Sequence, residues 1–158
     1  MTEYTLGFIF SSDYSKILLI KRGVHTFHTG KSNGLGGKIL IGESPKECMS
    51  RESKEESGVE IREDAWAFAG VMTGPLWKVW VFTTTISEKL FSSKKELKEG
   101  TVDWSSTKEL PNTIVSNLEW LIPFCKDKLN HPEITSFVVW YGGTPVDDGG
   151  LEPPTFAV

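Results

Sequence analysis

The chain has 158 residues and a formal net charge of -4 at pH 7, with 39% hydrophobic and 24% charged residues. This length suits one domain with one core, and the composition is that of an ordinary globular protein. The negative balance argues against an extended nucleic-acid-binding surface, which needs clustered Lys and Arg. A small anionic ligand is not excluded, because a bound cation can supply local positive charge.

The first part of the chain is rich in β-forming residues. Residues 4–10 and 16–21 have the composition of two strands, and the turn-forming residues 11–15 between them favour a hairpin. Residues 23–33 show no hydrophobic periodicity, so we expect a loop there. Residues 34–37, which include three glycines, then precede a short apolar stretch.

A helix is predicted over residues 44–57, where the start and stop signals are the clearest in the chain. Ser44 is a suitable N-cap, Pro45 suits the first helical position, and Glu47 completes an S-x-x-E capping box. Gly58 follows as a left-handed C-cap.

The middle of the chain is again β-rich. Residues 66–72 and 77–86 are separated by a Gly-Pro pair, which favours a second hairpin. Residues 87–99 are expected to form a charged loop, and residues 101–105 a short strand.

The last part of the chain contains a second helix. Residues 113–129 carry apolar side chains at helical core spacing, and Pro123 is expected to kink or split this helix. Residues 134–141 predict a final strand, and the Gly- and Pro-rich residues 142–158 are expected to form a flexible or loosely packed tail. We interpret residues 1–141 as a single domain. Several strands with two convincing helices, not in βαβ alternation, predict an α+β fold with a mixed sheet.

The cysteines and the N-terminal segment bear on the cellular compartment. Cys48 and Cys125 lie far apart and are interpreted as small buried apolar groups, so no disulfide scaffold is expected. The apolar run at residues 6–10 is too short for a membrane span and lacks the flanks of a signal peptide. We therefore expect a soluble, cytoplasmic protein without a membrane partner.

The helix predicted over residues 44–57 lacks the apolar stripe of an ordinary surface helix. One face carries Glu52, Glu55 and Glu56, so like charges crowd together in the half of the helix where the macrodipole disfavours them. A solvated charged face is one explanation, because Arg51 can pair with acids one turn away. A Mg²⁺ site is the other, since Mg²⁺ takes hard oxygen ligands and bridges carboxylates to substrate phosphates.

The glycine segment ahead of the helix favours the metal site. Gly34, Gly36 and Gly37 would let the backbone approach a ligand closely or adopt positive φ, although a tight turn or bulge would use glycine as well. Because this segment leads directly into the acidic helix, Lys38 could meet a phosphate as a point charge.

The spacing of these residues matches a known motif. Gly37, Glu43 and residues 51–59 (RESKEESGV) resemble the Nudix box, G-x5-E-x7-R-E-U-x-E-E-x-G-U, in which U is a bulky aliphatic residue. Every fixed position matches. Ser53 occupies a U position, and we expect this departure to weaken the packing of the helix on the sheet without changing the chemistry, with Met49 as the compensating residue.

The resemblance extends beyond the box. Residues 4–6, 21–23 and 33–38 resemble the MutT-type branch of the Nudix family, in particular the animal oxidised-purine nucleoside triphosphatases. The region of Trp104, with the acid Glu99 upstream of it, does so as well. The resemblance covers most of the chain. It implies the Nudix fold, an α/β/α sandwich around a mixed β-sheet.

The family resemblance also implies the chemistry. Nudix enzymes hydrolyse a nucleoside diphosphate linked to another group, with Mg²⁺ as cofactor and Mn²⁺ able to substitute. Carried over by position, Glu52, Glu55 and Glu56 would ligate the cation, together with the carbonyl of Gly37 or Gly36. Glu55 or Glu56 would orient or deprotonate the attacking water.

Three further charged residues are expected near this site, two in supporting roles and one with two alternative roles. Arg51 is expected to orient the glutamates through ion pairs, and Glu43 to brace the loop and the helix as their outer partner. Glu99 is either an additional metal ligand or base, or a solvated acid in the charged run of residues 94–99.

A separate set of residues is expected to contact the substrate: Thr5, Lys21, Phe27, Asn33, Gly36, Lys38 and Asn117. Asn33 resembles the family position that hydrogen-bonds the purine edge, because an amide offers both donor and acceptor. Phe27 could stack on the base. Asn117 is either a second polar reader of the base or an exposed helix residue.

Three functions follow from the residues and the resemblance. The first is hydrolysis of a modified nucleoside triphosphate, such as 8-oxo-dGTP, to the monophosphate and pyrophosphate, which residues 33–38 favour. The second is hydrolysis of ADP-ribose, dinucleoside polyphosphates, NADH or capped RNA. The third is a non-catalytic nucleotide-binding module, which the complete set of box carboxylates disfavours. A monomer and a homodimer both remain open.

Overall fold

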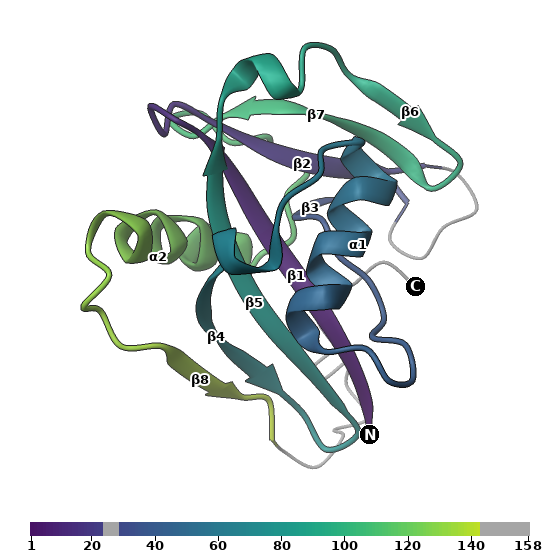
Figure 1. Ribbon diagram of the computed structural model, residues 1–158, viewed down its shortest axis with the longest axis vertical. Helices are drawn as coiled ribbons and strands as arrows, with labels where there is room; N and C mark the ends of the chain where they lie inside the picture. The colour runs from purple at the N-terminus through teal and green to yellow at the C-terminus, as the bar shows by residue number, and fades with distance from the viewer. Residues whose placement is uncertain (24–28, 143–158) are drawn as a thin grey trace.

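The computed structural model describes residues 1–23 and 29–142. Its centre is a mixed eight-stranded sheet in the order β6-β7-β2-β1-β5-β4-β8, with β3 paired to β2 (Figure 1). The strands are β1 (Thr2–Ser11), β2 (Lys16–Arg22), β3 (Ser32–Asn33), β4 (Ala67–Thr73), β5 (Trp77–Ile86), β6 (Lys95–Leu97), β7 (Gly100–Ser106) and β8 (Phe137–Trp140). The helices are α1 (Pro45–Ser57) and α2 (Leu118–Asn130), with short 3-10 turns η1 (Glu63–Ala65) and η2 (Glu88–Leu90).

Strand β1 is central to the sheet. It runs parallel to β5 over its whole length, from Thr2↔Trp77 to Ser11↔Ile86, and pairs antiparallel with β2 at Phe10↔Ile17. Parallel pairing of β1 with β5 and of β4 with β8, next to antiparallel pairs elsewhere, makes the sheet mixed.

A backbone segment that follows β3 takes the place of β2 beside the first half of β1. The N–H of Gly7 donates to Leu35 O at 2.7 Å, and the N–H of Thr5 donates to Gly37 O at 2.8 Å. An isolated bridge joins Tyr4 to Lys38. The glycine segment is therefore fixed to the sheet by backbone hydrogen bonds, and Gly36 and Gly37 face Glu56 and Glu52 of α1.

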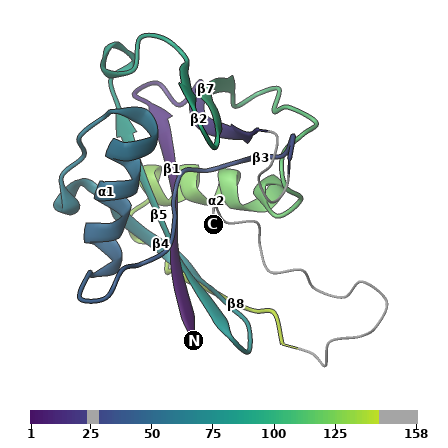
Figure 2. The same cartoon turned by 90° about the vertical axis from the view of Figure 1, so that its right-hand side faces the viewer.

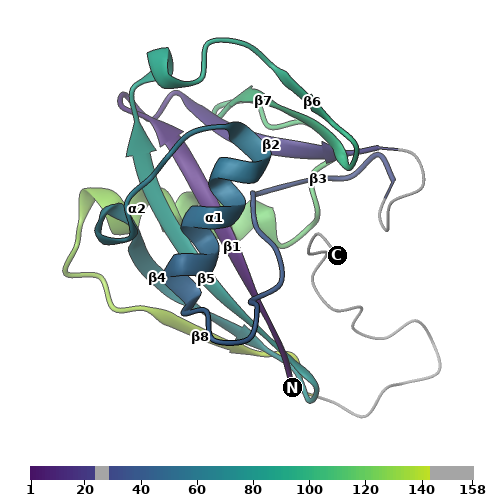
Figure 3. The ribbon, with the colours of Figure 1, turned by 45° about the vertical axis from the view of Figure 1, so that its right-hand side comes forward.

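The two helices cover opposite faces of the sheet, as Figures 2 and 3 show. On the α2 face, Leu118, Leu121 and Cys125 join a buried apolar cluster that includes Phe8 and Val81. On the α1 face, the second cluster is built from the alternate residues of the same strands and from one helix side chain, and it includes Ile9, Leu18, Ile20, Met49 and Phe82. The expected α/β/α sandwich around a mixed sheet is thus confirmed.

Both predicted hairpins are present, but the structure differs from expectation at three places. The charged loop predicted over residues 87–99 contains η2 and the short strand β6, which pairs with β7. Helix α2 begins at Leu118 because the residues before it are held by β3, where Ser32 bonds to Thr113 O and receives the N–H of Val115. Pro123 lies inside α2 and does not split it.

Two remaining expectations concern the cysteines and the tail. Cys48 and Cys125 are both buried and free. Of the tail predicted over residues 142–158, Gly142 alone belongs to the described residues. Among the described helices, none has the length and apolar character needed to cross a membrane.

Candidate active site

The predicted signals at both ends of α1 operate as expected. Ser44 has extended backbone angles, its Oγ accepts the N–H of Glu47 at 3.2 Å, and its own N–H donates to Glu47 Oε2 at 2.6 Å. At the other end, Gly58 adopts φ 78°, and its N–H donates to Lys54 O at 2.8 Å. These local bonds satisfy the terminal backbone groups and fix where the acidic face begins and ends.

Helix α1 buries an unusually polar surface. Met49 is fully buried over Gly7, where a Cβ would come within 2.6 Å of its sulfur atom. Ser53 is also fully buried, with its Oγ 3.5 Å from Val59 O, and Ser57 Oγ donates to Ser53 O at 2.6 Å. Small hydroxyl groups thus fill the contact where the Nudix box has an aliphatic residue, and Met49 supplies the one large apolar anchor.

Glu56 is the most deeply buried acid of the helix, at 7% exposure. The N–H of Gly36 donates to Glu56 Oε1 at 2.7 Å, and Arg22 Nη1 lies 3.8 Å from Oε2. Burial raises the pKa of Glu56 to about 8, although Arg22 and the Gly36 hydrogen bond act in the opposite direction. The carboxylate is therefore held at a defined point between the glycine segment and β2.

Arg22 is a site residue that the sequence did not single out. Its side chain is 6% exposed, and its guanidinium faces Glu56. Burial lowers the pKa of Arg22, but arginine stays protonated in proteins. The alternation of side chains along β2 indicates the position of Arg22. Leu18, Ile20 and Arg22 point to the α1 face, whereas Lys21 lies on the other face and is exposed.

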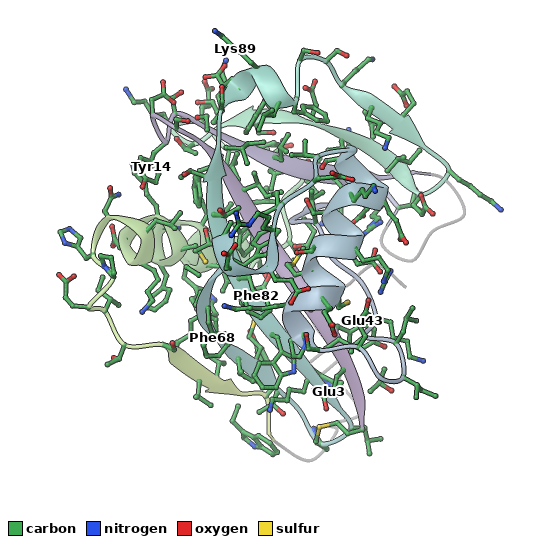
Figure 4. The ribbon with its side chains drawn as sticks, in the orientation of Figure 1. Glu3, Tyr14, Glu43, Phe68, Phe82 and Lys89 are labelled. Atoms are coloured by element: carbon green, nitrogen blue, oxygen red, sulfur yellow. The ribbon has the colours of Figure 1, made fainter. Side chains whose placement is uncertain are left out.

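Arg51 holds three carboxylates in fixed positions. Its Nε and Nη2 donate to Glu43 Oε1 and Oε2 at 2.7 Å and 3.0 Å, and its Nη1 donates to Glu52 Oε1 at 2.8 Å and contacts Glu55 Oε2 at 3.3 Å. The Glu43 hydrogen bonds raise the pKa of Arg51, and Arg51 in turn lowers the pKa of Glu43. Glu43, labelled in Figure 4, also accepts the N–H of Leu40, so this pair ties the loop to the helix.

The glycine segment is wedged between β1 and α1. A Cβ on Gly37 would lie 2.3 Å from Glu52 Oε1, and a Cβ on Gly36 would lie 2.0 Å from Thr5 O. Gly36 also has φ 154°, which L side chains rarely adopt. Glycine is required at Gly36 because the backbone of Thr5 and the positive φ leave no place for a side chain, whereas a side chain at Gly37 would displace the carboxylate of Glu52.

These residues line one cleft of about 360 Å³, which we call the carboxylate cleft. Glu99 joins it from the turn between β6 and β7, and its charge acts on both Arg22 and Glu56. The lining consists of Arg22, Gly36, Gly37, Lys38, Leu40, Glu52, Glu55, Glu56 and Glu99. The structure therefore brings together the three predicted glutamates of α1, Glu99, both glycines and Lys38.

Comparison with known proteins decides the family. A family model described as the NUDIX domain matches residues 3–124. The chain belongs to the Nudix family. As a Nudix protein it is a hydrolase that acts on phosphoanhydride bonds, as the box predicted.

Solved structures place this Nudix fold close to MutT proteins. The mutator MutT protein from Bacillus halodurans is 19% identical with a TM-score of 0.62, covering 78% of this chain and 80% of the other. A MutT structure from a study of Aliivibrio salmonicida and Vibrio cholerae is 25% identical, with a TM-score of 0.61 and coverages of 82% and 97%. A Nudix hydrolase from Nitrosomonas europaea is 16% identical, with a TM-score of 0.66 and coverages of 90% and 79%. The MutT-like assignment is confirmed.

Nudix hydrolases generally use divalent metal ions, and the donors in the carboxylate cleft suit one. Carboxylate and carbonyl oxygens are hard ligands, and burial raises the pKa of both Glu52 and Glu56, so their negative charge is incompletely balanced. Within the described residues, no three acidic, histidine or cysteine side chains already converge on one point. Arg51 engages Glu52 and Glu55, so ion binding requires these carboxylates to turn within the cleft.

Among the predicted substrate contacts that the structure describes, Gly36 and Lys38 line the carboxylate cleft, whereas Thr5, Lys21, Asn33 and Asn117 do not. Thr5 is fully buried, with its Oγ1 3.5 Å from Gly37 O and 3.3 Å from Cys48 Sγ. Asn33 is 4% exposed, and its Oδ1 accepts the N–H of Gly34 at 2.8 Å. Asn117 precedes α2 and contacts Met72 Sδ at 3.7 Å. Lys21 is exposed on β2, and Phe27 lies outside the described residues.

Proposed function

We propose that this chain hydrolyses a modified-purine nucleoside triphosphate, such as 8-oxo-dGTP, to the monophosphate and pyrophosphate. The observation that carries the proposal is the carboxylate cleft, which gathers Glu52, Glu55, Glu56 and Glu99 beside the glycine segment and two cations. The structural likeness to MutT proteins and the motif at residues 33–38 support this substrate class. The cytoplasm is the compartment in which we expect the reaction.

Mg²⁺ is the proposed cofactor, with Mn²⁺ able to substitute. Glu52, Glu55, Glu56 and Glu99 would hold it, with a carbonyl oxygen of Gly37 as a further donor. When bound, such an ion offsets phosphate charge and lowers the pKa of water. Gly37 O already accepts the N–H of Thr5, which fixes the direction of this carbonyl relative to the helix.

The positions of the other side chains in and around the cleft suggest a separate catalytic role for each. Glu55 is the acid best placed to orient the attacking water, because its side chain is 59% exposed, whereas Gly36 and Arg22 restrain Glu56. Arg51 positions the acids, and Glu43 anchors Arg51. Arg22 and Lys38 are the cations that would face the phosphates from the cleft wall.

Recognition of the base would fall to residues beyond the cleft. Asn33 and Asn117 are the proposed polar readers of the purine, and Thr5, Lys21 and Phe27 the further contacts. Asn33 and the cleft are connected by the glycine segment, which runs from Asn33 to Lys38 along β1. A nucleotide whose base is held at Asn33 would therefore extend its phosphates along this segment, toward Glu52 and Glu56.

A substrate panel tests this function directly. The full chain is incubated with Mg²⁺ and 8-oxo-dGTP, canonical dNTPs, ADP-ribose, diadenosine polyphosphates or capped RNA, and the products are identified. We expect release of pyrophosphate from 8-oxo-dGTP in preference to dGTP. Hydrolysis of none of these nucleotides would contradict the proposal.

The role of the cleft is tested by replacing one of its glutamates with glutamine. Glu56→Gln is expected to lower kcat by at least roughly a hundredfold, since even outer partners of metal ligands are worth about 10–100-fold. Glu60→Gln is the matched control, because Glu60 is an exposed acid just past α1 that pairs with Lys54. Equal activity of Glu56→Gln and wild type would remove Glu56 from the machinery.

A further inference from the structure

The β6–β7 hairpin brings Glu99 to the carboxylate cleft, to which the end of α1 contributes Glu55. Strand β6 pairs antiparallel with β7, and Glu99 lies in the turn between them. The N–H of Gly23 donates to Glu99 O at 2.9 Å, which ties this turn to the end of β2. Glu55 and Glu99 both line the cleft but belong to different elements, so their spacing depends on how the hairpin sits against the helix.

Lys95 is the side chain that joins the hairpin to α1. Its Nζ donates to Glu55 O at 3.3 Å, and a Cβ on Gly58 would lie 3.6 Å from the same nitrogen. The last turn of α1 and the hairpin lie side by side in Figures 1 and 3. Lys94, its neighbour in the chain, instead pairs with Glu96 of the hairpin itself.

The contact suits the electrostatics of a helix end. The last carbonyls of a helix lack intrahelical donors, and the macrodipole favours a cation beside them. The N–H of Gly58 donates to Lys54 O, and Lys95 provides a donor for the next carbonyl, that of Glu55. Because Lys95 belongs to β6, this bond also links the end of the helix to the hairpin.

Few other contacts fix the two elements against each other. The buried side chains in the last part of α1 are Ser53, Glu56 and Ser57, and the large apolar anchor Met49 lies one turn earlier. Strand β6 has three residues at the edge of the sheet, and of these Leu97 packs against the apolar cluster. A directed contact between two such loosely packed elements can therefore set their spacing.

We propose that Lys95 is a positioning residue, which sets the spacing of Glu55 and Glu99 across the carboxylate cleft. The inference rests on the proposed function, in which both acids serve one divalent ion. Lys95 itself does not line the cleft, so it acts through the two acids. Without its bond, the hairpin and the helix end would move apart, and one ion would no longer reach both carboxylates.

A double-mutant cycle with Glu99 separates positioning from general stabilisation. Lys95→Met removes the donor and the charge, and it should lower kcat roughly tenfold, the lower end of the range for outer partners of metal ligands. In the Glu99→Gln background the same change should alter kcat less than about twofold, because the spacing matters only while both acids act. Equal effects in the two backgrounds would show that Lys95 merely stabilises the fold, which would overturn the inference.

Two further variants control for the charge and for the position of the lysine. Lys95→Arg keeps a cation and a donor at the helix end, so its kcat should stay within about threefold of wild type. Lys94→Met removes the exposed cation that pairs with Glu96, and it should change kcat less than about twofold, since such surface pairs contribute little. A loss in Lys94→Met as large as that in Lys95→Met would contradict the assigned role.

The affinity for Mn²⁺ gives a readout without turnover. The nucleotide-free chain is titrated with Mn²⁺, and the free ion is followed by electron paramagnetic resonance. By charge alone, loss of a nearby cation would tighten Mn²⁺ binding, since like charges repel. Loss of positioning should instead raise the Kd of Lys95→Met roughly tenfold.

This titration also separates the inference from the proposed function. Unchanged or tighter Mn²⁺ binding by Lys95→Met would overturn the positioning role. If wild type hydrolyses the triphosphate in that case, the proposed function stands and the inference alone falls. If no triphosphate is hydrolysed but the Kd rises as expected, Lys95 still positions the two acids and the substrate assignment falls.

Discussion

The two helices of this Nudix fold have the same length but are held by different forces. Each has 13 residues, and they cover opposite faces of the sheet. Helix α2 buries Leu118, Leu121, Ile122 and Cys125, which is the apolar stripe of an ordinary amphipathic helix. Helix α1 buries Cys48 and Met49, and otherwise two serines and one glutamate.

Polar contacts take the place of that stripe in α1. The capping box fixes its first turn, Ser57 fastens its last turn, and Arg51 ties its middle to Glu43 and to Lys38 O. This arrangement leaves one face free for acids that a packed stripe would exclude. The contrast indicates that α2 mainly stabilises the fold, whereas α1 packs less tightly on the sheet and supplies the acids of the cleft.

The largest effect should come from removing an apolar anchor of α2. Leu121 is fully buried in the α2-side cluster, so Leu121→Ala should lower the free energy of unfolding by about 2–5 kcal/mol. Urea denaturation measures this loss, and kcat of the folded fraction should stay near the wild-type value. Glu119→Ala, on the exposed side of the same helix, is the control. A loss of activity larger than the loss of folded protein would contradict the assignment of a purely stabilising role to α2.

The next effect should come from Arg51 and should appear in activity. Arg51→Gln removes the donors that hold Glu43, Glu52 and Glu55, so kcat should fall roughly 10–100-fold, the range for partners of metal ligands. Arg62→Gln is the matched control, because Arg62 is 84% exposed and pairs with the nearby Asp64. Unchanged kcat in Arg51→Gln, measured at saturating Mg²⁺, would show that the ion pairs of Arg51 do not position the acids.

A smaller effect should distinguish the starts of the two helices. Ser44 caps α1 through its side chain, so Ser44→Ala should lower the free energy of unfolding by about 1 kcal/mol. Asn117, at the start of α2, makes no side-chain capping bond, so Asn117→Ala should destabilise the fold less. Urea midpoints of the two variants compare them directly. A larger loss for Asn117→Ala would reverse the assignment of local capping to α1.

The sequence predicted α1 better than any other element because its determinants are local. The capping box, Gly58 and the i+3 and i+4 spacing of the acids all act within a few residues, so position in the chain fixes position in space. The gathering of Glu52, Glu55 and Glu56 at one cleft followed from that spacing together with the Nudix box.

Features set by distant contacts could not be predicted in the same way. The alternation of β2 puts Arg22 and Lys21 on opposite faces, but only the packing of distant elements determines which face carries the cleft. The late start of α2 depends on β3, which has two residues and no composition signal of its own. The cavity of about 540 Å³ that Ile41 and Trp80 line likewise joins residues far apart in the chain.

The smallest effect concerns the serine that departs from the Nudix box. Ser53 Oγ makes a marginal contact of 3.5 Å with Val59 O, whereas Ser57 Oγ donates to Ser53 O at 2.6 Å and accepts the N–H of Val59 at 3.1 Å. Ser53→Ala should therefore change the free energy of unfolding by less than about 0.5 kcal/mol, because alanine's better helix propensity offsets the lost contact. Ser57→Ala should cost about 1 kcal/mol, since two buried bonds are lost. If Ser53→Ala proved the more damaging substitution in urea, its hydroxyl would be a true anchor of α1, and the helix would depend on this departure from the family pattern.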